Sequence, residues 1–148
     1  MKISQDFHLE EFVPKLVFQT FGAKSAWFID PRLIELVQEI RTNLGRRIYI
    51  NTWMDRGPYQ YRGFRPKNCT VGSTYSQHRR GCAVDIVVDG MGNEEVFEYL
   101  CNHWAGYDKF GLTVIENPKM TPGWTHLDLR AKIPGVHPEK MFLIVDPL

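Results

Sequence analysis

The chain has 148 residues, 43% of them hydrophobic and 24% charged, with a formal net charge of +1. This composition predicts a soluble globular protein of one domain, residues 1–148, with a sizeable core. A net charge close to zero does not indicate nucleic acid as a partner. No apolar run is long enough to predict membrane insertion.

Two further features concern the compartment. The three cysteines, Cys69, Cys82 and Cys101, are odd in number and lack ligand-like spacing, which favours free thiols over a disulfide framework. Residues 1–6 lack the apolar core of a secretory signal. The sequence therefore predicts synthesis in the cytoplasm without a signal peptide, where the protein stays unless another system releases it.

Two helices are expected in the first third of the chain. Residues 6–13 predict a short helix ended by Pro14. Asp30 and Pro31 mark the start of a longer helix, because a carboxylate caps the first turn and proline fits its first position. Gly45 supplies the end of this helix. Between these limits, apolar residues recur at helical spacing: Leu33, Ile34, Val37, Ile40 and Leu44.

Residues 47–52 predict a strand, and a long irregular segment follows from residue 53 to residue 75. Loops of this length inside a compact domain are usually functional or disordered. The aromatic and basic side chains of this segment favour a structured binding wall, and a surface loop anchored by aromatics is the alternative.

The second half of the chain predicts mainly strands. The expected elements are a strand at 82–88, a helix from about residue 94 to residue 103 capped by Asn93, strands at 110–116 and 124–129, and a segment from Met141 to Val145 that adds an edge strand or packs over the core. Together these elements predict an α+β fold, with a small, mainly antiparallel sheet and helices packed on one side.

The stretch from Ser76 to Asp85 predicts half of a zinc site. His78 and Asp85 are potential ligands of different type, seven residues apart, and Gly81 between them lets the backbone turn. Asp85 lies inside an apolar strand that continues through residues 86–88. A buried carboxylate must be paired, hydrogen-bonded or bound to a metal, so Asp85 is a candidate ligand.

The stretch from Trp124 to Leu129 predicts the other half. Strand alternation puts His126 and Asp128 on one face. If this strand runs beside the strand of Asp85, His126 completes a His/Asp/His set, and three protein ligands are typical of catalytic zinc. Asp128 is either an outer partner of this set or a surface charge. Cys82 is a rival ligand, but alternation puts it on the face opposite to Asp85.

These motifs resemble those of a known superfamily. Ser-x-His-x-x-Gly-x-Ala-x-Asp at residues 76–85, followed by Trp-x-His at residues 124–126, is similar to the zinc D-Ala-D-Ala carboxypeptidases and L-Ala-D-Glu endopeptidases. That superfamily shares its fold with the hedgehog signalling domain. The resemblance implies this fold, a Zn²⁺ cofactor held by His78, Asp85 and His126, and peptidoglycan stem peptides as the substrate.

The resemblance also implies a catalytic glutamate. Many members place it three residues before the last histidine, where this chain has Gly123. Other members place it at the end of the preceding strand, and Glu116 fits that version. We therefore expect Glu116 to be the base, with a solvated turn residue as the alternative.

Further residues are expected around the substrate. The resemblance implies that an arginine of the substrate loop, Arg56 or Arg65, stabilises the tetrahedral oxyanion. Ser76, Tyr75 and Trp124 are the candidate substrate-binding residues beside the metal motif.

The sequence thus predicts a zinc metallopeptidase that cleaves a D-amino-acid-containing bond of bacterial peptidoglycan, with carboxypeptidase and endopeptidase action both open. The lack of a signal peptide fits a phage lysin that a phage lysis system releases to the cell wall. The alternative, kept open by Gly123, is a non-catalytic zinc-binding module of the same fold, structural or cell-wall-binding, such as a phage particle component. A nuclease that uses the same His/Asp/His set is a third and more distant hypothesis.

Overall fold

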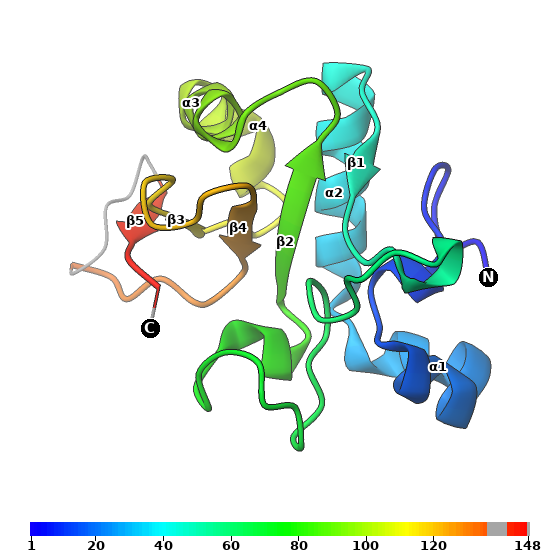
Figure 1. Cartoon of the computed structure of the whole chain (residues 1–148). Helices are drawn as coiled ribbons and strands as arrows, with labels where there is room; N and C mark the ends of the chain where they lie inside the picture. Colours follow the sequence, from blue (N-terminus) through cyan, green and yellow to red (C-terminus); the bar gives the residue numbers. More distant parts are fainter. Residues whose placement is uncertain (136–141, 148) are drawn as a thin grey trace.

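The computed structural model describes residues 1–135 and 142–147 (Figure 1). Its elements, with η for 3-10 helices, are η1 (Leu9–Glu11), α1 (Lys15–Phe21), η2 (Gly22–Phe28), α2 (Pro31–Leu44), β1 (Ile48–Tyr49), η3 (Trp53–Asp55), η4 (Gln77–Arg80), β2 (Ala83–Val88), α3 (Asn93–Asn102), α4 (Trp104–Asp108), β3 (Val114–Glu116), β4 (Thr125–Asp128) and β5 (Leu143–Val145). No helix in the described ranges combines the length and the apolar character that crossing a membrane requires.

The described strands form a five-stranded mixed sheet in the order β1-β2-β4-β3-β5. The β1–β2, β2–β4 and β3–β4 pairs are antiparallel, whereas β3 and β5 are parallel. The α+β class and the mainly antiparallel sheet are therefore confirmed. The register of the central pair sets Asp85 of β2 opposite His126 of β4.

Helix α2 forms where the sequence predicts it. The Asp30 carboxylate accepts a hydrogen bond from the backbone N–H of Arg32 at 3.0 Å, and Pro31 occupies the first turn. Gly45 ends the helix with a φ of 60°, a conformation that glycine adopts without steric cost. The buried face is formed by Leu33, Leu36, Val37 and Ile40.

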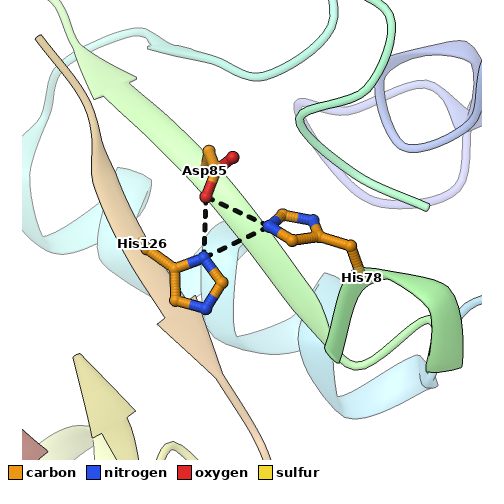
Figure 2. A group of neighbouring side chains, drawn as sticks. All are labelled: His78, Asp85 and His126. Carbon is orange, nitrogen blue, oxygen red and sulfur yellow. Dashed lines mark hydrogen bonds and ion pairs between the residues drawn. The ribbon is translucent and has the colours of Figure 1, made fainter. Parts of the chain in front are cut away.

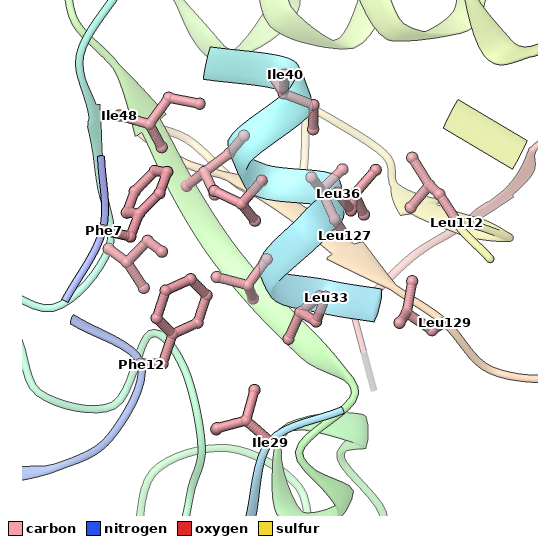
Figure 3. Packing of buried hydrophobic residues seen from close by; sticks show 14 of the residues in the cluster. Phe7, Phe12, Ile29, Leu33, Leu36, Ile40, Ile48, Leu112, Leu127 and Leu129 are labelled. Carbon is pink, nitrogen blue, oxygen red and sulfur yellow. The ribbon is translucent and has the colours of Figure 1, made fainter. Parts of the chain in front are cut away.

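The core lies between α2 and one face of the sheet (Figure 3). Val84, Ile86 and Val88 of β2 alternate into it, and Leu127 of β4 joins them. The apolar residues of α3 belong to the same cluster. Because side chains alternate along a strand, Asp85 and His126 point to the other face of the sheet. The side that carries the candidate site is thus opposite to the hydrophobic core.

The N-terminal region differs from the prediction. Only residues 9–11 of the expected helix at 6–13 are helical, because His8 is extended and pairs with Lys2 in an isolated antiparallel bridge. Pro14, expected to end that helix, is instead the N-cap of α1. Neither α1 nor η2 was predicted, because a proline can follow the end of one helix and also precede the start of the next.

Other predicted elements are shorter or shifted. Gly111 has a φ of 85°, which interrupts the strand predicted at 110–116 before β3 begins. Asn93 is the first residue of α3 and not its cap, because its side chain donates to the carbonyls of Pro118 and Thr121. β5 confirms the expected edge strand for its described part, while Met141 lies outside the described residues.

Candidate metal centre

Three elements bring the candidate ligands together. Asp85 and His126 face each other across the β2–β4 ladder, and His78 comes from η4, immediately before β2. Gly81 makes this approach possible, because it has a φ of 70° and a Cβ there would stand 1.8 Å from the carbonyl oxygen of Phe28. The predicted convergence of His78, Asp85 and His126 is confirmed, and all three residues are buried.

The three donor atoms form a small triangle, shown by the dashed lines of Figure 2. His78 Nε2 lies 3.2 Å from Asp85 Oδ1 and 3.2 Å from His126 Nδ1. His126 Nδ1 lies 2.8 Å from Asp85 Oδ1. Ligands bound to one ion at about 2.1 Å in a tetrahedral arrangement lie about 3.4 Å from one another. The triangle therefore has nearly the size of one face of a tetrahedral metal site.

In each imidazole ring, the nitrogen that lies outside the triangle has a hydrogen-bond partner of its own. His78 Nδ1 donates to the carbonyl oxygen of Gly63 at 2.8 Å, so Nε2 of the neutral ring carries the lone pair. His126 Nε2 lies 3.1 Å from the carboxylate of Asp128, which leaves Nδ1 as the ligand atom. Two lone pairs and a carboxylate oxygen thus converge on one point. Such a group is stable only with a cation or a proton between its members.

The acid–base properties of the group follow from burial and from the neighbouring charges. Burial lowers the pKa of His78, which keeps this ring neutral. Burial also opposes the charged form of His126, but its hydrogen bonds to Asp128 and Asp85 prevail and raise its pKa to about 9. Burial would raise the pKa of Asp85, yet His78 and His126 lower it, so Asp85 stays ionised. A proton on His126 is therefore the competitor of a metal ion.

Two arginines hold the acidic side chains around the ligands. Arg65 donates through Nη2 to Asp85 Oδ2 at 3.0 Å and through Nε to the carbonyl of Tyr61 at 2.7 Å, which leaves Asp85 Oδ1 for a metal. Arg130 donates through Nε to Asp128 Oδ1 at 2.8 Å, and Asp128 is fully buried. Arg130 was not among the residues predicted for the site, although alternation places it on the same face as Asp128, two residues further along.

The triangle lies in the wall of a cavity of about 340 Å³. The cavity is lined by Arg65, Val71, Gly72, Ser73, Ser76, Gln77, His78, Asp85, Glu116, Trp124, His126, Arg130, Val145, Asp146 and Pro147. Glu116, at the end of β3, places its Oε1 atom 4.0 Å from His126 Nε2. Burial raises the pKa of Glu116, as suits a group that takes up and returns protons.

The other candidate residues divide into two groups. Ser76 and Trp124 line the cavity together with Arg65. Tyr75 is 79% exposed, and Arg56 is an exposed residue at the end of η3, and neither belongs to the cavity wall. The long loop has no periodicity that would indicate which of its arginines turns inward. The three cysteines are free, as predicted.

Comparison with protein-family models, with curated proteins and with solved structures finds no match. The geometry of the centre indicates what chemistry its residues can perform. Two imidazole nitrogens and one carboxylate oxygen can hold a metal ion, and the cavity gives a further ligand access to it. A carboxylate with a raised pKa, Glu116, stands beside one of the ligand histidines.

Proposed function

We propose that the protein is a zinc-dependent peptidase that cleaves a D-amino-acid-containing bond of bacterial peptidoglycan stem peptides. One observation carries the proposal: the triangle of ligand atoms and the carboxylate of Glu116 belong to the same cavity. The motifs at residues 76–85 and 124–126, with their resemblance to zinc peptidases of the bacterial cell wall, support the choice of substrate.

Zinc is the metal that suits this donor set. Three protein ligands of the imidazole and carboxylate type, with access for a fourth ligand, are typical of catalytic zinc. When bound, zinc supplies a Lewis acid that lowers the pKa of water to about 7 and polarises a peptide carbonyl. Arg65 donates a hydrogen bond to Oδ2 of Asp85, so Oδ1 is the oxygen that would hold the ion.

Glu116 supplies the proton transfers of the proposed reaction. Its carboxylate accepts the proton of the attacking water and returns it to the leaving amine. Gly123, where many superfamily members have their glutamate, lies in the turn before β4 and does not line this cavity. The position of Glu116 in the cavity wall therefore supports its assignment as the base.

Cleavage of purified peptidoglycan tests the proposal. We expect the zinc-loaded protein to release new amine termini, and Glu116→Gln to keep its zinc while losing cleavage by about 10²- to 10⁴-fold. Glu98→Gln, at an exposed residue of α3, is the matched control and should retain full activity.

Two results would count against the proposal. Full activity in Glu116→Gln would remove this residue from the mechanism. Zinc-loaded protein that binds peptidoglycan without producing amine termini would favour the non-catalytic module, which Gly123 also suggests.

A further inference from the structure

Two arginines line the cavity, and they differ in how much of their guanidinium group is available. Arg65 uses Nε for the carbonyl of Tyr61 and Nη2 for Asp85, and only 11% of its side chain is exposed. A Cβ on Gly72 would stand 2.4 Å from Arg65 Nη1, so the loop covers the remaining end of the group. Arg65 is therefore committed to the metal centre.

Arg130 has one bound edge and one free edge. Its Nε and Nη2 atoms both donate to Asp128, and the backbone N–H of Arg130 donates to the same carboxylate. Within the described residues, no acceptor contacts Nη1 of Arg130. The side chain is 27% exposed and lines the cavity. Because Asp128 holds the Nε–Nη2 edge, the fork formed by Nη1 and Nη2 is oriented and available.

We propose that the Nη1–Nη2 fork of Arg130 binds a carboxylate of the peptide close to the bond that is cut. A guanidinium fork matches the two oxygens of a carboxylate, and the pair is frequently bidentate. Glu116 and Asp146 also line the cavity and disfavour ligands of higher negative charge, such as phosphate. A single carboxylate is the anion that suits these surroundings. The inference rests on the proposed peptidase function and narrows its substrate.

The position of Arg130 relative to the metal centre makes this contact selective. Asp128 Oδ2 accepts hydrogen bonds from both His126 Nε2 and Arg130 Nη2. One carboxylate thus joins a ligand histidine to the free guanidinium, and this fixes the offset between the metal and the peptide carboxylate. A peptide whose carboxylate lies at that distance from the scissile bond would place this bond at the metal. The carboxamide analogue of the peptide would lose the ion pair with Arg130.

A pair of synthetic stem peptides tests the proposal, one with free carboxylates and one with the same sequence as carboxamides. Binding is measured by calorimetry in the zinc-loaded Glu116→Gln protein, which does not turn the peptide over. We expect the free acid to bind at least about tenfold more tightly than the carboxamide. Adding Arg130→Gln should bring this ratio close to one, while Arg80→Gln, at an exposed arginine outside the cavity wall, should leave it unchanged.

The outcomes separate this inference from the proposed function. An unchanged ratio in a zinc-loaded Arg130→Gln variant, or no preference before Arg130 is changed, overturns the inference even if peptidoglycan is cleaved. A preference that depends on Arg130 supports it even if no bond is cut. If Arg130→Gln does not fold or load zinc, Arg130→Lys replaces it: a reduced ratio supports the proposal, and an unchanged ratio overturns it.

Discussion

Asp128 accepts a hydrogen bond from His126 Nε2 at 3.1 Å and thereby selects the ring nitrogen that faces Asp85 and His78. Because Asp128 is fully buried and held by Arg130, its carboxylate has a fixed position. Partners of this kind fix the tautomer of a metal-ligating histidine and raise its basicity. The metal centre therefore includes this outer pair as well as the three ligands.

Asp128→Asn tests the outer pair. Asparagine has nearly the same volume, but it is uncharged and holds Arg130 and His126 less firmly. We expect zinc affinity to fall by about 10- to 100-fold, measured by competition with a chromogenic chelator. Asp89→Asn, at an exposed aspartate after β2, should leave the affinity unchanged. An unaltered affinity in Asp128→Asn would show that the pair has no influence on the metal.

Proton release accompanies metal binding. In the metal-free protein, hydrogen bonds to Asp128 and Asp85 overcome the effect of burial and raise the pKa of His126 to about 9, so the ring is protonated below that pH. Zinc must displace this proton. Affinity should therefore fall about tenfold for each unit of pH lowered below about 9. Calorimetry at pH 6 in two buffers of different ionisation enthalpy should detect about one proton released per zinc; none released would contradict the raised pKa.

The same pKa predicts how the stability of the metal-free protein depends on pH. A pKa raised by folding contributes stability that is fully present below the ordinary histidine value of about 6.5 and is lost as the pH rises through about 9. The contribution of His126 to the free energy of unfolding should thus decline between these limits. Urea unfolding of chelator-treated protein at several pH values measures it, and a rise over this range would contradict the assignment.

Gly72→Ala tests the contact between the loop and Arg65. The new Cβ would stand 2.4 Å from Arg65 Nη1, and relief requires the guanidinium to move away from Asp85. We expect weaker zinc binding together with a loss of about 1 kcal/mol of stability from the positive φ of residue 72. Gly45 also has a positive φ, but a Cβ there would have no atom within 4 Å. Gly45→Ala should therefore lower the stability without changing the zinc affinity. Equal zinc affinity in the two variants would contradict this role of Arg65.

Arg79→Lys tests the loop that forms one cavity wall. The guanidinium of Arg79 donates to four carbonyl oxygens, at 2.7 to 3.1 Å, which belong to Pro66, Lys67, Cys69 and Ser73. A lysine cannot donate to all four carbonyls, so the backbone amides of residues 67–73 should exchange hydrogen faster. Arg80→Lys, at the exposed neighbour, is the control. Unchanged protection of the loop in Arg79→Lys would show that the guanidinium does not hold it.

Parts of the fold and of the centre were predictable because their signals are local. Asp30, Pro31 and Gly45 mark the ends of α2 through capping and backbone rules that need no partner. His78 and Asp85 were recognisable because a carboxylate inside an apolar strand needs a counterpart. Alternation then placed His126 on the matching face of its own strand.

The features that were missed depend on contacts between distant segments. The extended conformation of His8 follows from its pairing with Lys2, and the parallel pairing of β5 with β3 follows from the path of the whole chain. The inward position of Arg65 comes from its bonds to Tyr61 and Asp85, which no spacing within the loop encodes.

Metal content is the most direct test of the central claim that His78, Asp85 and His126 bind one divalent ion. Elemental analysis of protein purified without chelators, followed by zinc titration of the stripped protein, should give one zinc per chain, and His78→Ala and Asp85→Ala should each abolish this binding. His103→Ala, at an exposed histidine outside the cavity wall, should still bind one zinc. A folded protein that takes up no zinc, or that binds it equally well without His78 and Asp85, would contradict the claim.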